Sequence, residues 1–173
     1  MLTASGFFSP QEIAIALELI EQTLQQGSDS GYAFLFADEP TNPGQLQGYS
    51  CYGPIPATVN SFDLYWIAVA PQQQGLGLGK KLLQSTEACV LAAGGEQLLI
   101  ETSGREQYLP TRRFYQAMGY HISQQLVHGY GPGDDKITYT KHFPIMDASN
   151  LAAINKAADA TAQSMYCAQN QPG

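Results

Sequence analysis

The sequence has 173 residues, of which 44% are hydrophobic and 13% are charged, with 8 Lys and Arg against 15 Asp and Glu. This length fits one compact domain, and a net charge of −7 argues against a nucleic-acid partner, which needs a cationic surface. Because no apolar run is long enough to cross a bilayer and the N-terminus lacks the features of a secretory signal, we expect a cytoplasmic protein without a membrane partner.

The first predicted element is a helix that begins at Ser9-Pro10-Gln11-Glu12. Ser9 can accept hydrogen bonds from the free amides of the first turn, a proline fits that turn, and Glu12 completes a capping box. Apolar residues follow at helical spacing, and Gly27 ends the pattern.

Three strands are predicted next. Tyr32–Ala37 and Gln47–Tyr52 flank a turn-rich segment over 38–44, which indicates an antiparallel hairpin. Phe62–Val69 is apolar at nearly every position, as is typical of a central strand covered on both faces. Asp63 is the one charge in that run.

The second half of the chain alternates between helix and strand. The patterns predict a helix over 77–93, a strand over Gln97–Glu101, a helix over Leu109–Met118 and a hairpin of strands 120–130 and 136–143. A helix followed by three strands and then by these elements predicts an α/β (α+β) domain with a mixed sheet.

Gly75, Gly77 and Gly79 lie between the strand that ends before Pro71 and the helix that follows. Glycines let a backbone approach a ligand closely, and the unpaired amides of a helix N-terminus favour an anion such as phosphate. The P-loop pattern and the Rossmann pattern both fail here. A tight turn from strand to helix, with no ligand, is the alternative interpretation.

Two motifs resemble one family. Gln74-x-x-Gly77-x-Gly79 is similar to the (Arg/Gln)-x-x-Gly-x-(Gly/Ala) acetyl-CoA-binding motif of the GCN5-related N-acetyltransferase (GNAT) superfamily. Phe114-Tyr115-Gln116-Ala117-Met118-Gly119-Tyr120 resembles that family's FYxxxGF signature. The two lie in the family's order, with one helix and one strand between them. Segments 101–108, 110–113 and 130–136 further resemble a bacterial subset without an assigned substrate.

The resemblance implies a mixed, mostly antiparallel central sheet flanked by helices. Residues 1–143 would form the acetyltransferase domain, and residues 144–173 a C-terminal appendage that is partly helical, with a weak helix near 151–166, or disordered. Family members usually begin with a strand before their first helix, whereas this chain starts almost at the helix. We expect that edge strand either to be missing or to be replaced, for instance by the appendage.

The resemblance also implies an activity. Family members transfer an acetyl group from acetyl-CoA, their co-substrate, to a primary amine by direct transfer in a ternary complex. The acceptor would be a small amine, an amino acid or a peptide N-terminus, and a homodimer is possible in this fold. A non-catalytic acyl-CoA-binding module is the alternative.

Residue roles follow from position in the motifs. Tyr115 would protonate the departing CoA thiolate, and a carboxylate would remove the proton from the amine. Asp63 and Glu101 compete for that second role. Burial of Asp63 in an apolar strand would raise its pKa and make it a better base near neutrality, and a structural role for either carboxylate is the alternative.

The cofactor site carries over in the same way. The resemblance assigns the pantetheine arm to the backbone of Ile67, Ala68 and Val69, and the diphosphate to a run of amides in the loop and helix start. That run comprises Gln74, Gly75, Leu76, Gly77, Leu78, Gly79 and Lys80. The three histidines show no metal-binding spacing, so no metal is expected.

Some positions leave alternatives open. Tyr108 and Thr111 stand where many family members have Asn and Ala, which puts the pantetheine contact of that Asn in doubt. Cys51 acting as a covalent nucleophile would be a different chemistry, although no histidine is paired with it by spacing. The pair 134–135 could attract a cationic acceptor or simply form a turn, and the arginines at 112–113 could meet a CoA phosphate or simply be solvated.

Overall fold

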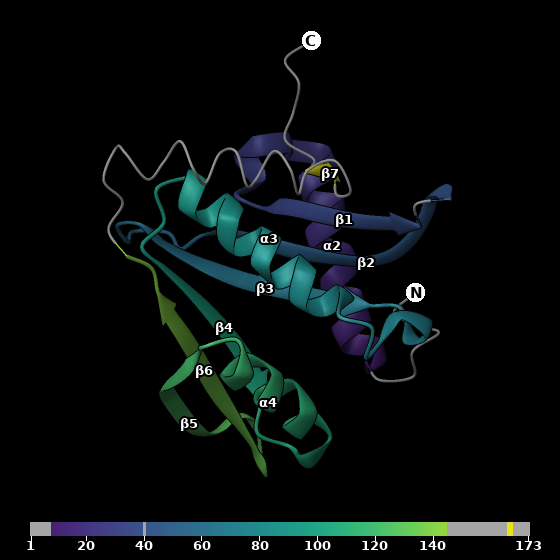
Figure 1. Cartoon of the computed structure of the whole chain (residues 1–173). Helices are drawn as coiled ribbons and strands as arrows, with labels where there is room; N and C mark the ends of the chain where they lie inside the picture. The colour runs from purple at the N-terminus through teal and green to yellow at the C-terminus, as the bar shows by residue number, and fades with distance from the viewer. Residues whose placement is uncertain (1–7, 40, 145–165, 168–173) are drawn as a thin grey trace.

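The computed structural model describes residues 8–39, 41–144 and 166–167, and Figure 1 shows their arrangement. In chain order the elements are α2 (Pro10–Gln26), η1 (Gly27–Ser30), β1 (Ala33–Glu39), β2 (Asn42–Pro54), β3 (Ser61–Val69), η2 (Pro71–Gln73), α3 (Leu78–Ala92), β4 (Gln97–Ser103), η3 (Glu106–Tyr108), α4 (Leu109–Ala117), β5 (His121–Gly131), β6 (Asp134–His142) and β7 (Tyr166–Cys167). The strands form one sheet in the order β5-β6-β4-β3-β2-β1-β7. Its neighbours are antiparallel except for β3 and β4, which are parallel. The predicted mixed, mostly antiparallel sheet is confirmed.

The first helix begins where the sequence predicts. Ser9 caps α2, the Ser9 amide donates to Glu12 Oε2 at 2.7 Å, and the Glu12 amide donates to Ser9 Oγ at 3.2 Å. This reciprocal capping box satisfies two amides that the helix itself cannot pair. It also fixes the direction in which the Glu12 side chain leaves the helix.

Helices cover both faces of the β1–β3 part of the sheet, with α3 on one face and α2 on the other (Figure 1). Side chains alternate between these faces along each strand. Phe34 joins the cluster that contains Leu19 and Ile20 of α2, whereas Leu35 joins the cluster that contains Leu82 of α3. None of the helices in the described part of the chain combines the length and the apolar character needed to cross a membrane.

The two hairpins are longer than predicted. β1 and β2 extend into the expected turn over 38–44, with irregular register near Asp38, and the turn between β5 and β6 is reduced to Pro132 and Gly133. Side-chain hydrogen bonds explain part of the extension, because Asp38 accepts from the Gly44 amide at 3.0 Å. Asp135 similarly accepts from the His128 amide at 3.0 Å. These two aspartates, of a residue type common in turns, therefore stabilise the ends of the two hairpin ladders.

The parallel strands β3 and β4 separate partway along their length. Their register runs from Ser61 paired with Gln97 to Leu64 paired with Ile100, and beyond that pair each strand continues with its other neighbour. Tyr65 is the extra residue of a β-bulge, because Leu64 and Trp66 take consecutive partners on β2. A bulge bends its strand, and Figure 1 shows β3 and β4 diverging.

The edge of the sheet beside β1 holds β7, which pairs with Leu35 and Phe36 in antiparallel fashion. Residues 166–167 thus lie at this edge of the sheet. This position agrees with one of the two alternatives for the missing first strand, in which the C-terminal appendage replaces it. Residues 151–165 of the helix predicted near 151–166 lie outside the described residues, and Tyr166, its predicted last residue, lies in β7 instead. The division into a domain over 1–143 and an appendage over 144–173 stays a prediction.

Candidate active site

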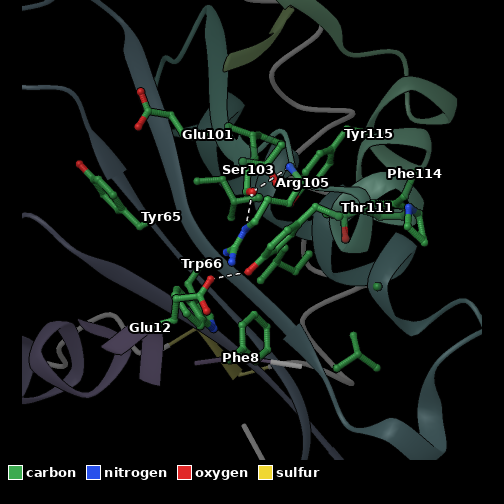
Figure 2. Close-up of a pocket in the computed structure, with 18 of the residues that line it drawn as sticks. Phe8, Glu12, Tyr65, Trp66, Glu101, Ser103, Arg105, Thr111, Phe114 and Tyr115 are labelled. Carbon is green, nitrogen blue, oxygen red and sulfur yellow. Dashed lines mark hydrogen bonds between the residues drawn. The ribbon is translucent and has the colours of Figure 1, made fainter. Parts of the chain in front are cut away.

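A cavity of about 1210 Å³ opens where β3 and β4 separate. Its walls come from α2, β3, the start of α3, β4, α4 and the hairpin of β5 and β6. In Figure 2, Phe8, Glu12 and Trp66 gather on one side of the pocket, and Thr111, Phe114 and Tyr115 on the other. The cavity therefore connects elements that are distant in the sequence.

One end of the cavity is the N-terminus of α3. Gly75 and Gly77 have φ of +76° and +85°, a left-handed conformation that favours glycine. A Cβ at either position would meet no atom within 4 Å, so open space lies beside this backbone. Gly77 is the N-cap of α3 and provides no side-chain cap for the first-turn amides. The glycines thus serve the turn and also leave room for a ligand at free amides, an arrangement suited to phosphate.

The other residues predicted for this loop divide into two groups. Gln74, Gly79 and Lys80 line the cavity. Leu76 and Leu78 do not, since the Leu76 side chain is 70% exposed and Leu78 packs against the core. A role for Leu78 in binding would rest on its backbone amide, whereas the amide of Leu76 already donates to the carbonyl of Gln73 at 3.4 Å.

Beyond Leu64, the edge of β3 that faces β4 has no ladder partner among the described residues. Ile67 and Val69 line the cavity along this edge, whereas Ala68 is buried in the cluster on the α2 face. An unpaired strand edge offers backbone donors and acceptors to an extended ligand. A pantetheine arm is such a ligand.

Tyr115 lies in α4, is 4% exposed and lines the cavity. Its ring contacts Phe114, Tyr120 and Tyr139, with centroid distances of 5.5, 6.1 and 5.8 Å. Its hydroxyl makes no hydrogen bond to the described part of the chain. Burial raises the pKa of Tyr115 well above its usual value, so the hydroxyl keeps its proton and can act as an acid.

The two candidate bases lie in different positions. Glu101 lines the cavity, and its Oε1 lies 2.8 Å from Lys136 Nζ. Asp63 is not among the lining residues, because it lies before the point of separation and is still paired with Gly53 and Leu99. Burial and the nearby Glu101 raise the pKa of Asp63 to about 6, and Lys136 opposes that shift.

A group of polar side chains in the cavity was predicted only in part, since the sequence offered the pair 134–135 for a cationic acceptor and Glu101 as a base. The Tyr108 hydroxyl donates to Glu12 Oε1, which joins α2 to η3 across 96 residues of chain. Arg105 Nε lies 3.0 Å from Asp134 Oδ2, and Ser103 Oγ donates to the other oxygen of Asp134 at 2.5 Å. All five of these residues line the cavity. The sequence predicted only the capping-box role for Glu12, and its place in the cavity lining is a second role that the motif does not indicate.

The structure gives the positions of three residues whose roles were left open. Arg112 Nη1 donates to the carbonyls of Ser103 and Arg105, both at 2.8 Å, so it ties the end of β4 to α4. Asp134 lines the cavity, whereas Asp135 supports the hairpin through Gln125 at 2.8 Å.

Cys51 does not suit a nucleophile. The residue is fully buried away from the cavity lining, and burial raises the pKa of its thiol to about 12. A thiol must ionise to attack, so this alternative chemistry is disfavoured. Within residues 8–39, 41–144 and 166–167, no three His, Cys, Asp or Glu side chains gather in a way that could hold a metal ion.

Comparisons with known proteins agree with this geometry. A family model described as an acetyltransferase (GNAT) domain matches residues 30–122. A GNAT-family protein from Desulfovibrio desulfuricans is 45% identical, with a TM-score of 0.77 over 82% of this chain and 87% of that chain. A search of curated proteins gives no match.

More distant structures share the fold. The ribosomal-protein-S18-alanine N-acetyltransferase from Escherichia coli is 18% identical, with a TM-score of 0.52 over 62% of this chain and 68% of that chain. An aminoglycoside 6'-N-acetyltransferase complexed with coenzyme A is also 18% identical, with a TM-score of 0.58 over 71% of this chain and 79% of that chain. The matched family model and the 45% identical relative show that this chain belongs to the GNAT acetyltransferase family.

Proposed function

We propose that the protein is an N-acetyltransferase that transfers acetyl from acetyl-CoA to a primary amine by direct transfer in a ternary complex. The observation that carries the proposal is the continuity of one cavity. Its lining includes the uncapped N-terminus of α3, the buried Tyr115, and the carboxylates of Glu12, Glu101 and Asp134. Thioester, acid and acceptor can therefore meet in one space.

Acetyl-CoA supplies the activated acetyl group, and the chain supplies the means of holding it. The free amides in the run from Gln74 to Lys80 would bind the diphosphate, because glycine backbone and a helix N-terminus favour an anion there. The amides of Gln74 and Leu76 already donate to the carbonyls of Pro71 and Gln73. The free edge of β3 over Ile67 to Val69 would pair with the pantetheine arm. The distant structure with bound coenzyme A supports this choice of co-substrate.

Two proton transfers fall to side chains of the cavity. Tyr115 would donate its proton to the departing thiolate sulfur, since its raised pKa keeps the hydroxyl protonated until the thiolate forms. An ammonium has no lone pair, so a base must first take a proton from the acceptor. We assign this step to Glu101, which lines the cavity, and keep Asp63 as the alternative, acting through Glu101 or a water.

The proposal is tested by incubating the purified chain with acetyl-CoA and a panel of primary amines. Release of free CoA thiol, together with a mass gain of one acetyl group on the amine, would support it. A reaction without amine measures thioester hydrolysis. Tight CoA binding with no acetylated product would instead support a non-catalytic acyl-CoA-binding module.

A further inference from the structure

We call the part of the cavity lined by Glu12, Glu101 and Asp134 the acceptor end. Two of these three carboxylates have a cationic partner. Asp134 pairs with Arg105 at 3.0 Å, and Glu101 pairs with Lys136 at 2.8 Å. Glu12 makes no ion pair within the described part of the chain. This end therefore has one negative charge that no nearby cation neutralises by contact.

The carboxylate of Glu12 is held in place from two sides. Its Oε2 accepts the Ser9 amide at 2.7 Å within the capping box, and its Oε1 accepts the hydroxyl of Tyr108. Partial burial alone would raise the pKa of Glu12, but these hydrogen bonds and the more distant charge of Arg105 lower it below its usual value. Glu12 is thus an ionised, oriented carboxylate at neutral pH.

Two aromatic rings lie beside this carboxylate (Figure 2), and other aromatic rings line the same cavity. Phe8 and Trp66 pack with centroids 5.0 Å apart, and Tyr65 and Tyr130 also line the cavity. Figure 2 shows Glu12 close to Phe8 and Trp66. Aromatic faces bind cations favourably and also accept the apolar part of an amine. The same cavity holds the hydroxyl of Tyr115, which has no partner in the described structure, so a polar ligand group fits there.

We propose, on the basis of the proposed N-acetyltransferase function, that Glu12 selects acceptors that bind as net cations, namely primary amines without a neighbouring carboxylate. An alkyl or arylalkyl amine, or an amino acid whose carboxyl group is an amide, meets this description. Free amino acids do not. Glu12 is then a specificity-determining residue that contacts the acceptor. The range of acceptors that the family resemblance leaves open becomes smaller, because free amino acids are excluded.

Rejection of free amino acids follows from the same inventory of charges. The cations at this end of the cavity are Arg105 and Lys136, and Asp134 and Glu101 already neutralise them. A substrate carboxylate would enter beside the unpaired charge of Glu12 and would find no unpaired cation at that end in the described structure. Like charges that meet in a partly enclosed site reduce affinity and thereby create specificity.

Calorimetry on the CoA-saturated protein tests the proposal without requiring turnover. The probes are phenethylamine, phenylalaninamide and phenylalanine, which share one aromatic side chain and differ in the carboxylate. We expect the first two to bind about tenfold more tightly than phenylalanine, as electrostatic complementarity favours the cation. Equal affinity for phenylalanine, or no binding of either carboxylate-free amine, would overturn the proposal.

A matched pair of variants locates the effect. Glu12→Gln keeps the capping box, since glutamine also serves at that position, and should weaken phenethylamine about tenfold through loss of the charge. Glu18→Gln removes an exposed carboxylate from the same helix, outside the cavity, and should leave that affinity unchanged. Equal affinity in Glu12→Gln and the parent would overturn the assignment. Failure of the proposed function has a different signature, in which amines bind but no CoA is released.

Discussion

Leu64 of β3 and Ile100 of β4 are the last pair of residues that join the two parallel strands, and the cavity opens directly beyond them. Each strand then stays with its antiparallel neighbour, so the sheet divides without losing its outer ladders. The bulge at Tyr65 lies immediately after this pair. A ligand held between the strands can therefore use backbone groups that a continuous sheet would have consumed.

Gly77→Ala should weaken acetyl-CoA binding, because its Cβ would occupy the open space beside the backbone where the diphosphate is proposed to lie. Backbone strain is a separate effect of the same substitution. An alanine at positive φ costs about 1–2 kcal/mol. Gly94→Ala is the matched control, because Gly94 also has positive φ (+81°) and open space beside it, but lies after the other end of α3. We expect similar losses of stability in thermal melts and a higher Kd for acetyl-CoA in Gly77→Ala alone. Equal Kd values would leave the loop with a turn role only.

Tyr115→Phe should lower kcat by about tenfold or more, since it removes the proposed acid. The KM for acetyl-CoA should stay close to that of the parent. Tyr120→Phe is the control, because it removes another buried hydroxyl, which donates to Glu87 at 2.9 Å outside the cavity. Steady-state kinetics on both variants decide the matter, and an unchanged kcat in Tyr115→Phe would remove that residue from the mechanism.

The two carboxylates can be separated by kinetics. Glu101→Gln should reduce kcat by about a hundredfold if it is the base, and the loss should persist at all pH values. Asp63→Asn should leave most of kcat but change the low-pH limb of the profile, because the pKa of Asp63 is raised to about 6. The opposite result, a large loss in Asp63→Asn with Glu101→Gln active, would transfer the base role to Asp63.

Asp63 should also make stability depend on pH. Its folded pKa of about 6 lies above the unfolded value of 3.8, so the folded state binds the proton more tightly and stability falls as pH rises between these values. Because Asp63 is only partly buried, screening limits the effect to about 1 kcal/mol. Asp63→Asn should therefore melt at a higher temperature than the parent near pH 7. The difference in melting temperature between the variant and the parent should narrow towards pH 4. A difference that does not narrow would show that the raised pKa of Asp63 is not its cause.

Cys51→Ala should keep kcat within about threefold of the parent, because a direct transfer needs no enzyme nucleophile. The thiol is buried in the cluster that contains Phe34 and Tyr49, so the variant should lose some stability. Kinetics measured below the melting transition separate these effects. Loss of turnover in a folded Cys51→Ala protein would point to an acyl-enzyme route.

Local signals in the sequence predicted most of the fold. The capping box at Ser9 and Glu12 located the start of α2, and Gly119 correctly marked the end of α4, because each acts within one or two helical turns. Strand ends were less accurate. At Asp38 a side-chain contact with the Gly44 amide extends a ladder where composition alone indicated a turn.

Most contacts at the acceptor end of the site could not be predicted, because they join segments that are distant in the sequence. Nothing near Glu12 in the sequence indicates a hydrogen bond from Tyr108, and nothing near Arg112 indicates the carbonyl of Ser103. For Asp63, the sequence predicted a property of the side chain but not its position relative to the cavity. Its charge in an apolar strand was informative about its pKa, but the lining of the cavity starts one residue later, where the pairing with β4 ends.

A crystal structure of the chain grown with acetyl-CoA tests the central claim most directly. The diphosphate should lie against the amides between Gly75 and Lys80, and the pantetheine arm should run beside Ile67 and Val69, with its thioester near the Tyr115 hydroxyl. Acetyl-CoA bound elsewhere, or a cavity that stays empty at saturating concentration, would contradict the account.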